Sequence, residues 1–175
     1  MNQRTAHIKC FGCQMNKLDS ELIASALRDA GFALADTAKG ADVVLLNTCS
    51  VREHAEDRVF SHLGHLKHLK KHRPDMVVGV VGCMAQRLGD RLLEHDTVDI
   101  VCGPTQIGRI AELVADATSR GERKLAVSAK VRQGNEADSA LLEQFESLHG
   151  GDGMEDRPLP GQAFVRVMRG CNNFC

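Results

Sequence analysis

The chain has 175 residues, with 22 Lys and Arg against 23 Asp and Glu, a net charge of −1, and neither Trp nor Tyr. This length fits one compact domain with an appendage, and the near-neutral charge argues against broad electrostatic binding of nucleic acid, although it leaves room for a local basic patch. The longest apolar runs are too short to span a bilayer, and the start lacks the apolar core of a signal peptide. We therefore expect a cytoplasmic protein that does not enter a membrane.

Apolar strands alternate with amphipathic helices through the first two thirds of the chain. The expected strands cover residues 8–11, 32–34, 42–46, 76–81 and 98–101. The expected helices cover residues 18–30, 53–72, 88–94 and 106–118, the first of them with Asn16 as N-cap and Gly31 as its stop. Because the strands lack polar alternation and helices follow them, the pattern predicts an α/β fold with a flavodoxin-like, doubly wound, mostly parallel sheet covered on both faces.

The regular pattern decays after residue 118. Residues 119–162 contain Gly- and Pro-rich stretches and are predicted to be a linker, with a short helix at 140–147. Alternation returns at 163–168, which predicts a new strand, and the chain stops soon after it. We therefore expect a first domain over 1–118, the linker, and over 163–175 the truncated start of a second domain.

Seven cysteines, an odd number in a reducing compartment, favour metal or redox chemistry over a disulfide framework. Cys13, Cys49 and Cys83 each come just after a predicted parallel strand, where the strand ends of an open α/β sheet form a ligand-binding crevice. Three thiolates that converge there would hold a [4Fe–4S] cluster and leave one iron open for a substrate or a sulfur donor. The alternative is that each is a small buried core residue.

The remaining cysteines and the histidines carry weaker signals. Cys10 and Cys102 are predicted to be core residues in strands. Cys171 and Cys175 form a C-x3-C pair after the last strand, a spacing that also suits half of a zinc site. Four histidines follow helical spacing among basic residues and predict a solvated face that could touch phosphates; they are His62, His65, His68 and His72.

Four motifs in order resemble the radical-SAM methylthiotransferases. They are Phe-Gly-Cys-Gln-Met-Asn at 11–16, Leu-Asn-Thr-Cys-Ser-Val-Arg-Glu at 46–53, Gly-Cys-Met-Ala-Gln at 82–86 and Met-Arg-Gly-Cys-Asn-Asn-Phe-Cys at 168–175. The Gly-Cys-Gln-Met-Asn form is similar to the members that modify tRNA. The resemblance implies a methylthio group inserted at C2 of N6-dimethylallyladenosine, at position 37 of tRNA.

The resemblance also implies cofactors, ligands and partners. Cys13, Cys49 and Cys83 match the ligands of an auxiliary [4Fe–4S] cluster. Cys171 and Cys175 match the first two cysteines of the radical-SAM C-x3-C-x2-C motif, whose third cysteine would come after residue 175. The full enzyme would then carry two [4Fe–4S] clusters and S-adenosylmethionine, whereas this chain would hold one cluster, supply no catalytic residue and be inactive alone. Expected partners are tRNA, bound mainly by regions outside the chain, and an electron donor such as a flavodoxin or ferredoxin; a monomer is expected.

Three alternatives remain open at this point. The first is a relative that methylthiolates a ribosomal protein, and the second is a non-catalytic iron–sulfur carrier or electron-transfer module. The third is a plain α/β interaction domain whose cysteines belong to the core. Iron binding separates the third alternative from the others.

Overall fold

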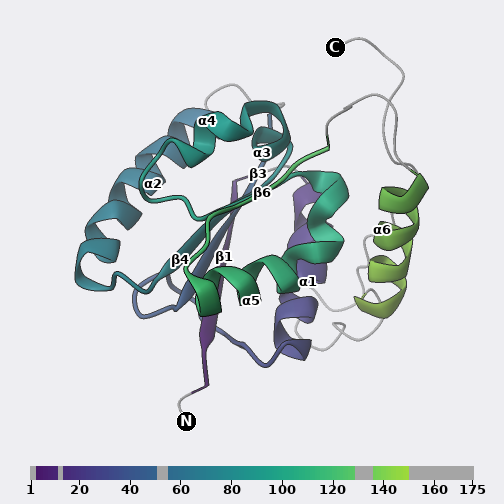
Figure 1. The fold of residues 1–175 in the computed structure, drawn as a ribbon, viewed down its shortest axis with the longest axis horizontal. Helices are drawn as coiled ribbons and strands as arrows, with labels where there is room; N and C mark the ends of the chain where they lie inside the picture. The colour runs from purple at the N-terminus through teal and green to yellow at the C-terminus, as the bar shows by residue number, and fades with distance from the viewer. Residues whose placement is uncertain (1–2, 12–13, 51–54, 129–135, 150–175) are drawn as a thin grey trace.

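The computed structural model describes residues 3–11, 14–50, 55–128 and 136–149 (Figure 1). Six strands form one parallel sheet in the spatial order β2-β1-β3-β4-β5-β6. The strands are β1 (Thr5–Phe11), β2 (Ala33–Leu34), β3 (Val43–Thr48), β4 (Val77–Gly82), β5 (Ile100–Cys102) and β6 (Lys124–Ala126). The helices are α1 (Gln14–Asp29), α2 (Ala55–His72), α3 (Cys83–Leu88), α4 (Asp90–Leu93), the 3-10 helix η1 (Pro104–Arg109), α5 (Ile110–Arg120) and α6 (Glu136–His149). The predicted flavodoxin-like α/β fold is confirmed.

Helices cover both faces of the sheet (Figure 1). Side chains from α1, α5 and α6 pack against one face, and side chains from α2, α3 and α4 pack against the other. Every residue of β3 and β4 is buried, which explains why both strands read as continuous apolar runs rather than alternating ones. None of the described helices is long and apolar enough to cross a membrane.

Several helix limits differ from the sequence prediction. The first helix begins at Gln14, so Asn16 lies inside it and is not its N-cap. The helix predicted over 88–94 is two short helices, α3 and α4, separated at Gly89. The helix predicted over 106–118 begins as η1 and continues as α5. Short polar residues such as Asn16 favour helix starts, but here a tertiary hydrogen bond takes the side chain instead.

Two elements lie within the segment 119–162 that the sequence predicts to be a linker. Strand β6 pairs with β5, and α6 buries Leu142 and Phe145 in the core beside α1. The described part of this segment therefore packs against the domain, and the short predicted helix at 140–147 falls within α6. The division of the chain at residues 118 and 162 stays a prediction, and the predicted strand at 163–168 lies outside the described residues.

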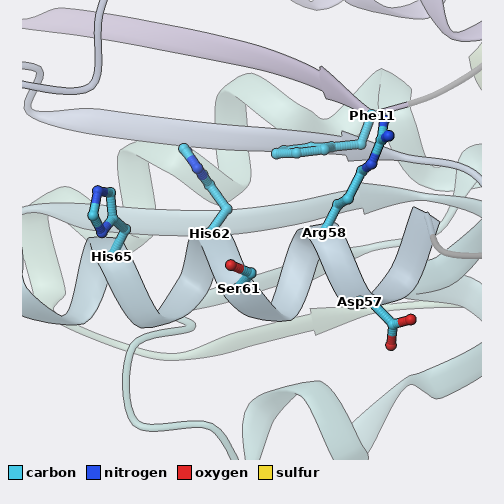
Figure 2. A pocket seen from close by; sticks show the side chains of 6 residues that line it. All are labelled: Phe11, Asp57, Arg58, Ser61, His62 and His65. Carbon is cyan, nitrogen blue, oxygen red and sulfur yellow. The ribbon is translucent and has the colours of Figure 1, made fainter.

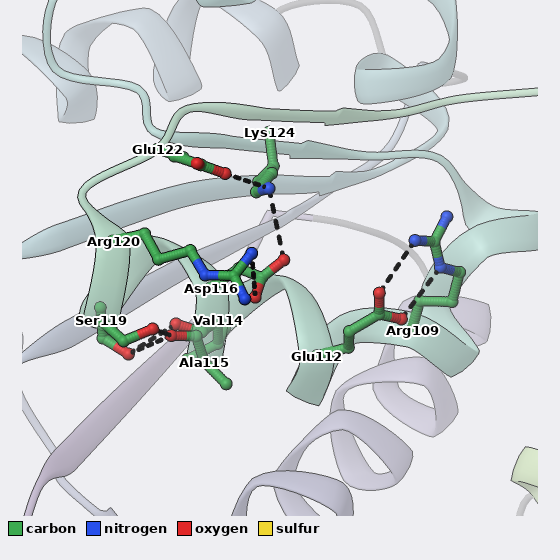
Figure 3. A network of polar contacts seen from close by, with 10 residues as sticks. Arg109, Glu112, Val114, Ala115, Asp116, Ser119, Arg120, Glu122 and Lys124 are labelled. Carbon is green, nitrogen blue, oxygen red and sulfur yellow. Dashed lines mark hydrogen bonds and ion pairs between the residues drawn. The ribbon is translucent and has the colours of Figure 1, made fainter.

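Ion pairs on the surface hold the short edge strand β6 (Figure 3). The Lys124 Nζ lies 2.6 Å from a Glu122 carboxylate oxygen and 3.3 Å from one of Asp116, which belongs to α5. Arg123 donates through Nε to the Val98 carbonyl at 2.9 Å. Because exposed pairs contribute little energy each, we interpret them as orienting β6 rather than as a main source of stability.

At the amino ends of the strands, aspartates accept hydrogen bonds from the neighbouring strand. An Asp42 carboxylate oxygen accepts from Thr5 N at 2.8 Å, and an Asp99 carboxylate oxygen accepts from Val78 N at 2.8 Å. Arg73 pairs with Asp42 at 2.7 Å, and the Lys70 ammonium pairs with Asp99. Charged side chains therefore cover the amino ends of these strands.

Candidate metal centre

The carboxyl ends of the three central strands lie level with one another. Phe11, the last residue of β1, is in register with Thr48 of β3, and Thr48 is in register with Gly82 of β4. Cys49 and Cys83 are the next residues after the ends of β3 and β4. Neighbouring strands are about 4.8 Å apart, so the two cysteine backbones leave the sheet side by side. The strand order reverses between β1 and β3, which is where open α/β sheets bind ligands.

The structure describes two of the five predicted ligand cysteines. Cys49 is buried, at 2% exposure, whereas Cys83 is the first residue of α3 and is exposed. Cys13, Cys171 and Cys175 lie outside the described residues. Within the described part of the chain, no group of three His, Cys, Asp or Glu side chains is arranged to hold a metal ion. The three-cysteine ligand set therefore stays a prediction.

A buried network of short polar side chains supports the carboxyl ends of β3 and β4. Asn16 Nδ2 donates to Asn47 Oδ1 and to the Thr48 carbonyl, each at 2.9 Å. Asn47 Nδ2 donates in return to the Asn16 carbonyl at 2.8 Å and to Ser20 Oγ at 2.9 Å. Thr48 Oγ1 donates to the Val81 carbonyl at 2.7 Å. These bonds join α1, β3 and β4 directly beneath the residues that follow the strands.

This network was not predicted from the sequence, although Asn47 and Thr48 belong to the motif at residues 46–53. The available signal was the pair of polar residues at the end of an otherwise apolar strand. Asn16, Asn47 and Thr48 are all at most 4% exposed, and buried polar groups need hydrogen-bond partners. A polar pair at the end of a core strand therefore indicates a partner that has to come from another element.

Gly82 determines how the chain leaves β4. Its φ of +97° and ψ of −158° belong to a backbone region that is essentially restricted to glycine. A Cβ at this position would lie 2.4 Å from the Thr48 carbonyl oxygen and 3.0 Å from Asn47 Oδ1. Only glycine therefore lets β4 end this close to β3 and turn directly into α3, which begins with Cys83.

Gln86 fixes the other end of α3. Its side-chain amide donates to the Ser128 carbonyl at 2.9 Å and accepts from Ser128 N at 3.1 Å. These two bonds tie α3 to the chain just after β6. The short helix that carries Cys83 is thus held at Gly82 on one side and at Gln86 on the other, which accounts physically for two residues of the 82–86 motif.

The thiols that follow the carboxyl ends of β3 and β4 are of the kind that binds an iron–sulfur cluster. Thiolates are the usual protein ligands of such clusters, and Cys49 and Cys83 leave two adjacent strands at the same level. Ser50, directly after Cys49, has a buried hydroxyl oxygen without a hydrogen-bond partner among the residues that the structure describes. A buried hydroxyl of this kind can donate to a group bound beside it. The residues present therefore suit a cluster held at this edge.

The two cysteines that were predicted to be core residues differ in their environment. Cys102 in β5 is 0% exposed, and burial raises the pKa of its thiol to about 12. Cys10 in β1 is exposed, so the prediction for it is wrong. The reason is that β2 pairs only with Thr5 and Ala6, so the second half of β1 lies at the edge of the sheet.

The histidine face of α2 is solvated except at one position. His65, His68 and His72 are exposed, as the sequence predicts. His62 is only partly exposed and packs edge-to-face against Phe11, with a ring-centroid distance of 5.4 Å. Burial, and then the nearby charges of Lys9, His65 and His7, lower the pKa of His62. This histidine is therefore neutral at pH 7.

Comparison with known proteins gives consistent matches. A model of the family described as "Uncharacterized protein family UPF0004" matches residues 5–103. The chain is 40% identical to the "tRNA-2-methylthio-N(6)-dimethylallyladenosine synthase" of Rhodopirellula baltica, over 98% of this chain and 36% of that protein. Proteins of the same name match from Polynucleobacter asymbioticus, at 40% identity over 97% of the chain and 35% of the relative, and from Bacteroides fragilis, at 38% over 96% and 34%. The chain spans about a third of the length of these curated relatives.

Proposed function

Because the chain belongs to the family UPF0004, whose model matches more than half of it, we propose that it forms the N-terminal domain of a tRNA methylthiotransferase. The proposed reaction is insertion of a methylthio group at C2 of N6-dimethylallyladenosine in tRNA, and it requires regions outside this chain. The names of the relatives support this reaction. The proposed task of this domain is to hold an auxiliary [4Fe–4S] cluster through Cys13, Cys49 and Cys83.

The main observation that supports the proposal is that the carboxyl ends of β3 and β4 lie level with each other. Thr48 and Gly82 are in register, and a cysteine follows each of them. The Asn16–Asn47–Thr48 network and the Gly82 turn hold both strand ends in fixed positions. A preformed site of this kind favours cluster binding, because less ordering is left to be done when the ligands engage. Cys13 would complete the set from the end of β1, two residues after Phe11.

The chemistry divides between the cofactors and the protein. The auxiliary cluster, when bound, would supply the sulfur that is methylated and inserted, at an iron that has no protein ligand. The residues of this chain position and tune rather than react. Because Cys49 is buried and Cys83 is exposed, these two residues would hold the cluster at the boundary between the core and the surface. Cys171 and Cys175 would serve the separate radical-SAM cluster, which also needs S-adenosylmethionine and an electron donor.

Anaerobic reconstitution of the purified chain with iron and sulfide tests the cluster assignment. We expect about four irons per chain, one [4Fe–4S] cluster, with its charge-transfer absorption in the visible range. Cys49→Ala should lose this iron. Cys102→Ala is the matched control, because it removes a buried strand-end thiol from the neighbouring strand and should keep the iron. Cys171→Ala should also keep it, since two ligands of an incomplete site bind weakly.

Two results would contradict the proposal. If Cys49→Ala retained the iron while Cys171→Ala lost it, the ligands would belong to the other set. If the wild-type chain bound no iron at all, the interaction-domain alternative would replace the proposed one. In the full-length protein, Cys49→Ala should in addition abolish the methylthio product, measured by mass spectrometry of tRNA nucleosides. A full-length protein that binds the cluster but forms no such product would instead favour the iron–sulfur carrier alternative.

A further inference from the structure

A surface groove of about 510 Å³ lies between α2 and the end of β1. Its lining residues are Phe11, Asp57, Arg58, Ser61, His62 and His65 (Figure 2). Arg58 and His62 project from α2 toward the Phe11 side of the groove, whereas Asp57 points away from it (Figure 2). The groove therefore presents an aromatic wall and cationic or polar side chains, with its only carboxylate directed elsewhere.

The charge around the groove is positive. Lys9 and Arg58 are both exposed, and no ion pair formed by a described residue engages either of them. Lys9 belongs to β1 and lies close enough to His62 to act on its charge, as His7 and His65 also do. A chain with a net charge of −1 thus gathers uncompensated cations at one place, which suits an anionic ligand.

His62 adds an unsatisfied polar atom to this groove. Its Nε2 is buried and has no hydrogen-bond partner within the described part of the chain. The ring packs edge-to-face with Phe11, so its position is fixed by packing rather than by a polar partner. A neutral imidazole offers one donor and one acceptor, and a hydroxyl or a base edge bound in the groove would satisfy Nε2.

The groove also adjoins the proposed metal centre. Phe11 lies at the groove and ends β1, in register with Thr48, the residue before Cys49. Beyond Ala6, β1 has no outer neighbour among the described strands, so a long ligand could pass along this edge. An anionic polymer with flat, unstacked bases is the ligand that fits cations, an aromatic wall and an open path.

We propose that this groove binds a single-stranded segment of the RNA substrate, with phosphates at Arg58 and Lys9 and a base against Phe11 and His62. The inference rests on the proposed function, and deepens it by assigning a substrate-binding surface to this domain. It places the RNA strand beside the carboxyl ends of the strands, where Cys49 and Cys83 follow β3 and β4.

Fluorescence anisotropy with a labelled RNA hairpin carrying an A-rich loop tests the inference on the purified chain. Each phosphate contact to a single strand contributes a slope of about −0.7 to log K against log salt, which is roughly fivefold in affinity at about 0.1 M salt. Arg58→Gln should therefore weaken binding about fivefold and reduce the slope by about 0.7. Phe11→Leu, which keeps an apolar side chain, should weaken binding of the loop but not of a blunt RNA duplex.

Lys71→Gln is the matched control, because it removes the same charge from the same helix. Lys71 is in the last turn of α2, about 20 Å along the helix axis from Arg58, which is beyond the Debye length of about 10 Å at 0.1 M salt. Its affinity and slope should match the wild type. Equal effects of Arg58→Gln and Lys71→Gln on RNA binding, or no effect of either, would overturn the inference. Binding of polyglutamate that Arg58→Gln abolishes would overturn it too, because such binding indicates a site for an acidic protein.

The iron measurement separates this inference from the proposed function. Arg58 is exposed and outside the Asn16–Asn47–Thr48 network, so Arg58→Gln should bind the same amount of iron as the wild type. If iron binding follows the expected pattern while RNA binding does not depend on Arg58, only the groove assignment fails. If Cys49→Ala keeps its iron, the proposed function fails whatever the RNA result.

Discussion

Replacement of Gly82 by alanine tests whether the turn between β4 and α3 is as constrained as its geometry indicates. The φ of +97° and ψ of −158° would cost an alanine about 1–3 kcal/mol. The new Cβ would also lie 2.4 Å from the Thr48 carbonyl oxygen, and relief of that contact would pull apart the ends of β3 and β4. The Thr48–Val81 hydrogen bond spans these ends, and its loss adds about 1 kcal/mol.

The expected sum for Gly82→Ala is about 2–4 kcal/mol, a large share of the 5–15 kcal/mol that stabilises a typical domain. Gly121→Ala is the control, because Gly121 has a φ of +65° but no atom within 4 Å of a Cβ, so it should cost only about 1–2 kcal/mol. Urea unfolding followed by circular dichroism measures both, since the chain has no Trp or Tyr. Equal costs for the two variants would refute the close-approach argument.

Three further predictions address the core, the thiols and α6. Asn47→Leu should lower the free energy of unfolding by about 2–4 kcal/mol in urea titrations, because it removes the buried hydrogen bonds that Asn47 makes with the Asn16 side chain and the Asn16 carbonyl. Cys10 should react with iodoacetamide in the native state and Cys102 only after unfolding. Burial raises the pKa of the Cys102 thiol from 9.0 to about 12, so the contribution of this thiol to the free energy of unfolding should be complete below pH 9 and be lost as the pH rises toward 12. Cys102→Ala should remove that loss. Phe145→Ala should cost about 3–5 kcal/mol while Leu148→Ala, at 62% exposure, should change the unfolding midpoint little; equal effects would show that α6 does not pack as described.

The sheet could be predicted from sequence because its strands are nearly pure apolar runs. Residues 42–46 and 76–81 correspond to β3 and β4, which are buried on both faces, and burial of this kind leaves a direct mark on composition. Strand β6 leaves no such mark. It has three residues at the edge of the sheet, of which Lys124 is partly exposed, Leu125 is exposed and Ala126 is buried, so the segment is indistinguishable from a loop by composition.

The site was predictable to the level of topology but not of contacts. The positions of Cys49 and Cys83 could be deduced from a parallel sheet, because the carboxyl ends of all its strands lie on the same side. The Asn16–Asn47 bond joins residues 31 positions apart, and no local pattern specifies such a pair. The same limit explains Cys10: its exposure depends on the shortness of β2, a neighbour in space that contributes only two residues.

The amino ends and the carboxyl ends of the strands differ for a chemical reason that bears on the ligands. Amino ends of strands expose N–H donors, and here the carboxylates of Asp42 and Asp99 accept from them. Carboxyl ends expose C=O acceptors, and the donors Asn16 Nδ2 and Thr48 Oγ1 satisfy the carbonyls of Thr48 and Val81. Amide and hydroxyl groups thus complete the strand ends of β3 and β4, and a cysteine follows each strand directly. Because the ends are held by residues other than the cysteines, Cys49→Ala should lose iron without a matching loss of fold, and this separation is what makes iron content a clean measure of ligation.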